Sequence, residues 1–102
     1  MNMKFHPQRP EICDAIRNKQ QIAFLYHGKL RKGNPQCYGI NKKGKEALRV
    51  HLVEGGSRPE QMFLLDDALD FKIQNEHFVR PGPNYHKGDK DMVHIFCELD
   101  DD

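Results

Sequence analysis

Hydrophobic and polar positions first follow a helical spacing, over residues 10–19. Ile12, Ala15 and Ile16 recur at intervals of three and four, which places them on one face of a helix. Pro10 suits the first helical position, because the N–H that proline lacks would have no partner there. A helix of about ten residues is only marginally stable by itself. The pattern therefore predicts a helix over 10–19 that packs against the rest of the chain.

Beyond this segment the hydrophobic spacing changes to the alternation that is typical of β-strands. The clearest case is 46–53, where Leu48, Val50 and Leu52 face one way and the residues between them face the other. Pro35 is expected at a sheet edge or a bend, because it cannot donate to a strand ladder. The candidate strand segments, from which we expect five or six strands, are residues 21–26, 30–34, 37–40, 46–53, 61–65, 69–73 and 93–99.

One short helix followed by five or six short strands indicates a mostly β (α+β) fold, and we expect a small Sm/SH3-like barrel. Closing one sheet on itself would hide its edges, with a helical turn or a tight corner at 65–68. The 102 residues suffice for a single domain, 1–102. Leu, Ile, Val and Phe make up about 24% of the chain, above the ~20% below which charged chains tend to stay disordered. The apolar runs are much shorter than the ~20 residues of a membrane span, so no membrane partner is expected.

The net charge of +1 conceals a strong asymmetry. Residues 1–50 carry eleven Lys or Arg against three acidic residues, and residues 51–102 carry five against twelve. The stretch 29–49 is especially basic and includes or adjoins tyrosines. Such a composition suits phosphate contacts and base stacking, although lysines at turn tips are also ordinary surface residues. The acidic excess is partly the run Asp100–Asp102, which is expected to be a solvated tail.

The three cysteines, Cys13, Cys37 and Cys97, are an odd number without a CxxC spacing. This pattern argues against a disulfide framework and for small buried side chains in a reducing compartment. The first seven residues contain no long apolar segment of the kind found in signal peptides. Together these features predict a cytoplasmic protein.

Motifs of catalytic chemistry are missing from the sequence. It has one serine, Ser57, no threonine, and neither a phosphate-binding loop nor a dinucleotide-binding glycine motif. The six histidines show no HxH, HxxxH or HExxH spacing, and His94 and Cys97 would point to opposite faces of a strand. We therefore expect a protein that is not an enzyme, with no cofactor and no metal.

Residues 12–78 resemble a WYL-type domain, the small Sm/SH3-like barrel of bacterial regulators. A helix with Ala15-Ile16 leads into the strand Ile22–Tyr26, and the following hairpin continues through Arg31 to Pro35. The segment Glu46–Val53, the loop Gly55-Gly56, the run Phe63–Asp66 and Phe78 then follow in the family's order.

The resemblance divides the chain into a WYL-like barrel core, residues 10–78, and a C-terminal extension, residues 79–102, with a last strand and an acidic tail. Ala47-Leu48-Arg49 stands where the family has Trp-Tyr-Leu, and Gln61 and Asp67 stand where it often has arginines of its ligand-binding face. The helix-turn-helix that usually accompanies the barrel is not predicted here.

Six side chains are candidate ligand-binding residues. Arg31 follows a tight turn and could pair with a phosphate or carboxylate, or form a structural ion pair with the acidic half of the chain. Arg49 and His51 leave the same face of one strand, which is either a binding face or an ordinary solvated one. Residues 80–87 either close a pocket over the barrel mouth or only connect two strands. The candidates are Tyr26, Arg31, Tyr38, Arg49, His51 and Arg80.

These features predict a non-catalytic ligand-sensing or regulatory module. Its ligand would be anionic, either a nucleotide or a short single-stranded nucleic acid, bound on the basic face of the barrel. The alternative is a protein-interaction or oligomerisation module that uses an exposed strand edge to bind a protein partner or a second copy.

Overall fold

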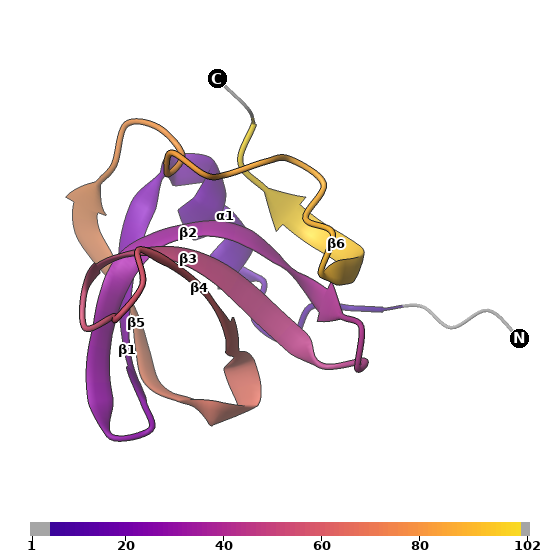
Figure 1. Cartoon of the computed structure of the whole chain (residues 1–102), viewed down its shortest axis with the longest axis horizontal. Coiled ribbons are helices and arrows are strands. Elements are labelled where there is room, and N and C mark those ends of the chain that lie inside the picture. Colours follow the sequence, from indigo (N-terminus) through magenta and orange to yellow (C-terminus); the bar gives the residue numbers. More distant parts are fainter. Residues whose placement is uncertain (1–4, 101–102) are drawn as a thin grey trace, which may run out of the picture.

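The computed structural model describes residues 5–100 and contains one helix, six strands and a short 3-10 turn (Figure 1). The mostly β class and the N-terminal helix are confirmed, and residues 65–68 contain the helical turn. Asp101 and Asp102 of the predicted tail lie outside the described residues. The elements are α1 (Glu11–Asn18), β1 (Gln20–Tyr26), β2 (Lys29–Asn41), β3 (Glu46–Glu54), β4 (Glu60–Leu64), η1 (Leu65–Asp67), β5 (Ala68–His77) and β6 (Met92–Glu98).

The strands form one antiparallel sheet in the order β4-β3-β2-β1-β5, and β6 also pairs with β2. The two predicted segments 30–34 and 37–40 are one long strand, β2. Its first part pairs with β1 up to Gly33, and its second part pairs with β6 from Cys37 onward. Pro35 lies between these two regions, where a missing N–H disrupts neither ladder. Pro35 also faces Val50 of β3, beside a register shift between Pro35 and Cys37, so it lies within the sheet and not at its edge.

The sheet is open. The prediction that it closes on itself is wrong, because no backbone hydrogen bonds join the two ends of the strand order among the described residues. Strands β4 and β5 are its two edges, and the described residues contain no ladder between them. Residues outside the sheet lie near this opening. The Arg9 guanidinium donates to the Leu65 carbonyl at 3.4 Å and lies 5.6 Å from the centre of the Phe71 ring.

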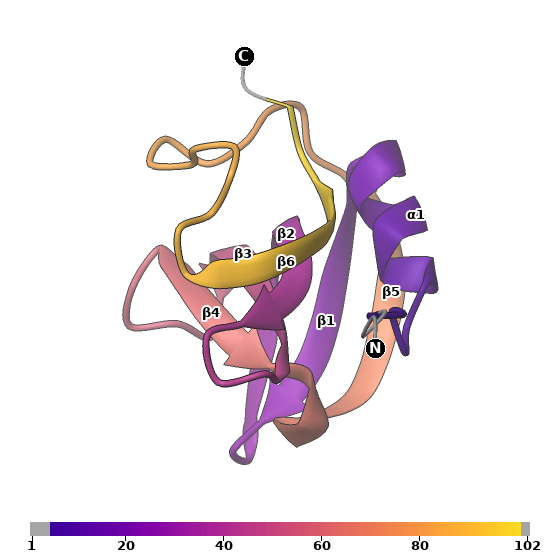
Figure 2. The same ribbon diagram turned by 90° about the vertical axis from the view of Figure 1, so that its right-hand side faces the viewer.

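The core forms where α1 packs against the concave side of the sheet. Ile12, Ala15 and Ile16, the predicted apolar stripe of the helix, are all buried. Figure 2 shows the helix beside β1 and β5, which it contacts together with β2 and β6. On the sheet side, the strands supply aromatic and aliphatic side chains, with alternating burial in β3 and continuous burial from Gly33 to Ile40 in β2. The largest fully buried ones are Tyr38, Phe24, Phe63, Ile22, Leu48 and Val50.

The cysteine prediction is wrong for two of the three residues. Cys13 of α1 and Cys97 of β6 form a disulfide between Cα atoms 5.6 Å apart, across 84 residues of sequence. Cys37 is free and buried, as predicted. Since burial, followed by the charges of Asp89 and Glu98, raises the pKa of the Cys37 thiol to about 12, this thiol stays protonated.

Residues 78–91, which we call the strap, connect β5 to β6. The strap runs over the outer side of β2 and β3 before it enters β6 (Figure 1). Tyr85 of the strap is buried, and its hydroxyl donates to the Leu99 carbonyl at 2.5 Å. The helix among the described residues is too short to cross a membrane.

Candidate functional site

Strand β3 presents Arg49 and His51 on its outer face, as its alternation predicts. Leu48, Val50 and Leu52 point into the core, and the two polar side chains between them are half-buried beneath the strap. Both predicted residues therefore lie on one face, but they belong to two different clefts.

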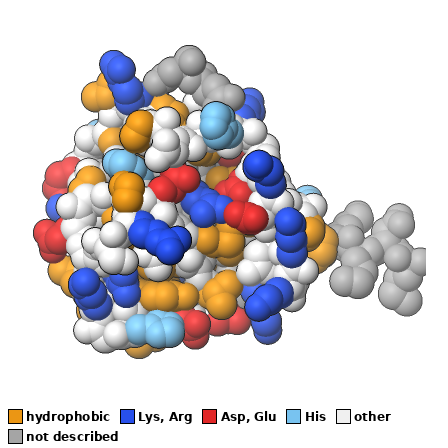
Figure 3. Space-filling view, in the orientation of Figure 1, with side chains coloured by type: hydrophobic (Ala, Val, Ile, Leu, Met, Phe, Trp, Pro, Cys, Tyr) orange, Lys and Arg blue, Asp and Glu red, His pale blue; other side chains and the backbone are white. Residues whose placement is uncertain are grey.

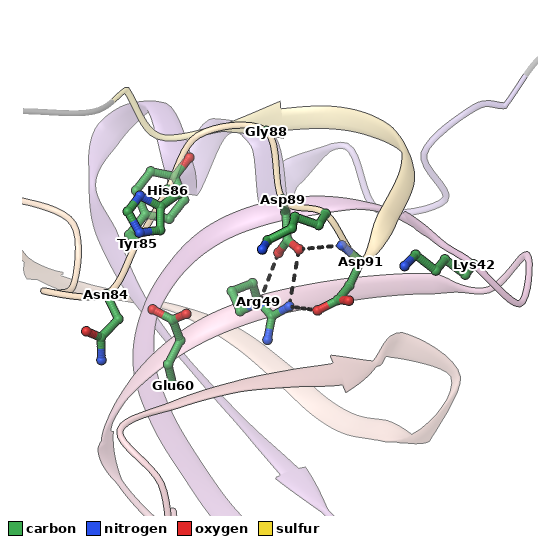
Figure 4. A pocket seen from close by; sticks show the side chains of 10 residues that line it. Lys42, Arg49, Glu60, Asn84, Tyr85, His86, Gly88, Asp89 and Asp91 are labelled. Carbon is green, nitrogen blue, oxygen red and sulfur yellow. Dashed lines mark hydrogen bonds and ion pairs between the residues drawn. The ribbon is translucent and has the colours of Figure 1, made fainter.

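Arg49 is an anchor for the strap. Its guanidinium donates to both carboxylate oxygens of Asp89, at 2.9 and 3.2 Å, and to Asp91 at 2.7 Å (Figure 4). The side chains of Arg49 and Asp89 are only 18% and 9% exposed, so this bidentate pair is shielded from solvent. The acidic and basic halves of the chain thus meet here, at a structural ion pair.

This ion pair predicts an acid-sensitive contribution to stability. Burial by itself raises the pKa of Asp89, but the Arg49 guanidinium and the Asp91 N–H lower it below its usual value. A carboxyl with a lowered pKa contributes stability that is present above its unfolded pKa, about 4, and is lost as the pH falls toward its folded pKa. Between pH 5 and pH 3, urea denaturation should therefore show a steeper loss of unfolding free energy for the wild type than for Asp89→Asn. Equal slopes would contradict the assignment.

The cleft around Arg49 has a volume of about 470 Å³ and carries charges of both signs. Lys42 and Lys90 line it, but so do Glu60, Asp89 and Asp91. Figure 4 shows the two aspartates directed toward Arg49 and Glu60 on the opposite side of the cleft. Asp89 and Asp91 accept the hydrogen bonds of the Arg49 guanidinium, and the negative charges that line the cleft would repel an anionic ligand.

Arg31 also lies in a structural environment. Its guanidinium donates to the Gly55 carbonyl at 2.9 Å and to the Tyr26 carbonyl at 3.3 Å, and it lies 5.6 Å from the centre of the Phe63 ring. Arg31 Nε is buried and has no hydrogen-bond partner. Arg31 therefore ties the β1–β2 hairpin to the β3–β4 loop through its structural contacts, and ligand binding by Arg31 stays a prediction.

The two predicted tyrosines are packing residues. Tyr38 is 0% exposed, so it cannot stack on a ligand. Its hydroxyl donates to Glu46 and accepts from the Arg9 N–H, and burial raises the pKa of the phenol above its usual range. Tyr26 is half-buried, with its ring edge-on to Phe63 and its hydroxyl accepting from the Leu64 N–H at 3.3 Å.

His51 and Arg80 meet at a second cleft, which we call the groove. It has a volume of about 490 Å³ between β3 and the start of the strap. The Arg80 guanidinium is exposed and forms no ion pair with a described carboxylate, and His51 is half-buried. Among the residues that the structure describes, no carboxylate lines the groove. The lining residues are Asn34, His51, Phe78, Val79, Arg80, Pro81, Gly82 and Pro83.

The strap approaches β2 and β3 closely at the base of the groove. Gly82 donates its N–H to Oε1 of Gln36 at 3.0 Å, and Gln36 is fully buried. A Cβ on Gly82 would lie 2.7 Å from Nδ1 of His51. Glycine is therefore required for this approach, and the buried amide of Gln36 fixes the position of the strap.

Of the six candidate residues, the structure brings only His51 and Arg80 together in one cleft. The sequence analysis missed Asp89, Gln36 and the apolar walls Phe78 and Val79. The one signal that could have located the groove was the rigid segment Pro81–Pro83, because it predicts a fixed course for the chain beside Arg80.

Charged residues of both signs are interspersed on the face that carries β2, β3 and the strap, and no continuous basic wall is seen there (Figure 3). The lysines of the β2–β3 turn, Lys42, Lys43 and Lys45, are exposed. Within residues 5–100, no group of three or more His, Cys, Asp or Glu side chains is placed to hold a metal ion.

Comparisons with models of protein families, with curated proteins and with solved structures give no match to this chain. The resemblance to WYL-type domains therefore remains a prediction based on the residues quoted above.

Proposed function

We propose that this protein is a non-catalytic ligand-sensing module and that the groove binds the anionic ligand. The observation that carries the proposal is the exposed Arg80, which has no carboxylate partner among residues 5–100 and lies at a cleft with apolar walls. Within the same residues, no acidic side chain lines this cleft. The Arg49 cleft lacks this property because three carboxylates line it.

The groove suits a mononucleotide better than a long nucleic acid. Arg80 can bind a phosphate through two parallel hydrogen bonds, while Phe78, Pro81 and Pro83 offer apolar surface for a base. The volume of about 490 Å³ falls within the ~300–1,000 Å³ of small-molecule sites. A polynucleotide site needs several cations along a track, whereas this groove offers one arginine and one histidine.

The finer fold assignment belongs to the same proposal. We propose that the bent sheet is related to Sm/SH3-like barrels and that the chain is a WYL-like domain. The order of helix, hairpin, long bent strand and 3-10 turn before β5 supports this relation. A regulatory role would then require a partner that responds to the occupied groove.

Removing the charge of Arg80 tests the proposal. In titrations with adenosine 5′-monophosphate followed by calorimetry, Arg80→Gln should weaken binding about 10- to 100-fold, because a hydrogen bond to a charged group contributes ~1.5–3 kcal/mol. Arg58→Gln is the matched control, since Arg58 is also an exposed loop arginine but lies outside the groove. Equal effects of the two substitutions, or no binding by the wild type at millimolar nucleotide, would refute the proposal.

The alternative of self-association has weaker support. Leu25 pairs in register with Leu30 and Leu69, so the three side chains form a row on the face opposite the core. Leu30 is 49% and Leu69 62% exposed. A stable interface usually involves about 20–30 residues a side, and a row of three leucines is much smaller. Oligomerisation therefore stays a prediction, and sedimentation velocity over a range of concentrations would test it.

A further inference from the structure

The strap is connected to α1 at its start, through the residue that follows the helix, and beyond its end, through β6. At its start, the Phe78 N–H donates to the Lys19 carbonyl at 2.9 Å, directly after the helix, and Lys19 Nζ donates to the Val79 carbonyl at 3.0 Å. At its end, the strap continues into β6, which the disulfide joins to Cys13 in the helix. The start of the strap, which forms one wall of the groove, is therefore bonded to the residue after α1, and the disulfide fixes α1 to β6.

The middle of the strap has anchors that do not depend on the helix. Asp89 is paired with Arg49 of β3, and Gly82 is bound to the side chain of Gln36 in β2. The Gln36 carbonyl also accepts the Leu99 N–H at 2.9 Å, just beyond β6. These contacts and the aromatic core would remain if the disulfide opened, so we expect the reduced protein to stay folded.

The helix itself depends on attachments. It has only eight residues, from Glu11 to Asn18, and a helix this short is unstable without tertiary contacts. The wall of the groove next to the Lys19 contacts is loosely packed, because Val79 is 76% exposed and Arg80 is exposed too. Freedom gained by α1 would pass directly to Phe78, Val79 and Arg80, where the groove begins.

We propose that the Cys13–Cys97 disulfide is a redox switch for the groove: the oxidised protein holds α1, and through it the strap, in the binding arrangement, and reduction releases them. The expected effect on ligand binding rests on the proposed function, because the switch would regulate the same groove. Reduction by a dithiol breaks the S–S bond, transfers two electrons and two protons to give two thiols, and converts the dithiol into a disulfide.

The chemical setting suits a switch with two states. Cys13 and Cys97 are both half-buried, so a small reductant can approach them after a modest local opening. Cys37 is a poor competitor for either sulfur, because it is fully buried and its thiol remains protonated. Disulfides that persist are typical of oxidising compartments, whereas those in reducing ones are usually transient and redox-sensing. A redox switch reconciles the bond with the predicted cytoplasmic location.

Amide hydrogen exchange of the whole chain, followed by NMR, tests the switch without any ligand. On reduction with dithiothreitol, the exchange rate of the Phe78 amide, which donates to the Lys19 carbonyl, should rise at least tenfold beyond any change at the Val50 amide in β3, which serves as the reference for global unfolding. The double variant Cys13→Ser/Cys97→Ser should show the fast rates with or without reductant. Cys37→Ala is the matched control and should respond to reductant as the wild type does.

Titration with adenosine 5′-monophosphate supplies the second readout. Binding should be at least fivefold weaker in the reduced than in the oxidised protein. Unchanged exchange at Phe78 would overturn the switch even if the nucleotide binds, and so would equal affinity in the two states. Absence of nucleotide binding in both states would refute the proposed function, while the exchange rates would still decide whether the disulfide controls the strap.

Discussion

Replacing Arg49 by methionine should lower the free energy of unfolding by about 3–5 kcal/mol, the cost of leaving one partner of a buried ion pair uncompensated. The Asp89 side chain is only 9% exposed and receives two hydrogen bonds from Arg49. Without the guanidinium, its carboxylate would have to be rehydrated or protonated, and the strap would lose its attachment to β3. Urea denaturation at pH 7 measures the change.

Arg17→Met provides the matched control for this experiment. Arg17 forms an ion pair with Asp14 in which both side chains are more than 60% exposed, and such surface pairs contribute ~0–1 kcal/mol. The double variant Arg49→Met/Asp89→Asn should recover a part of the loss, since it removes the uncompensated charge as well. If Arg49→Met destabilises no more than Arg17→Met, the pair is not the anchor of the strap.

Local patterns predicted the elements of this fold well. The spacing of Ile12, Ala15 and Ile16 identified α1 and its buried face, and the alternation in 46–53 identified β3. Both signals depend only on neighbours in sequence, because side-chain direction follows the period of the element. The same rule placed Arg49 and His51 on the outer face of one strand.

Partners across the sequence could not be predicted in this way. A guanidinium that follows a turn, such as Arg31, has the same local pattern whether it binds a ligand or a backbone carbonyl. The bidentate pair of Arg49 with Asp89 joins residues 40 positions apart, and nothing in the neighbourhood of either residue indicates the other. Two of the six candidates share the groove only because the strap returns over β3.

Closure of the sheet failed as a prediction for a related reason. Whether β4 and β5 pair depends on the geometry of η1 and on what fills the space between the two edges. Arg9, which precedes α1, reaches η1 and the Phe71 ring. The sequence indicates the number and length of the strands, but these do not determine whether β4 and β5 pair.

The disulfide is the largest feature that the cysteine pattern concealed. Three cysteines without a CxxC spacing suggested free thiols, but the long strand β2 pairs with β6 and also contacts α1, which brings Cys13 and Cys97 together. Cys37 is the cysteine left over, and its burial agrees with the prediction made for all three.

Removing this bond should have the second large effect on stability. Cys13→Ser/Cys97→Ser should lower the free energy of unfolding by about 2–4 kcal/mol, because the open chain gains conformational freedom mainly in the unfolded state. Chain-entropy estimates for a loop that spans 84 residues reach about 4.5 kcal/mol. Urea denaturation of the oxidised wild type and of the variant, both without reductant, measures the difference.

The reduced wild type separates the effect of the bond from that of the substitutions. Its midpoint in urea should fall to that of the double serine variant, while the variant itself should not respond to reductant. Cys37→Ala keeps the bond and should respond as the wild type does. Wild-type midpoints that agree within error with and without reductant would mean that the bond does not form in solution, and α1 would then be held to β6 by packing alone. That outcome would remove the redox switch and leave the groove with Arg80 and His51 as a separate question.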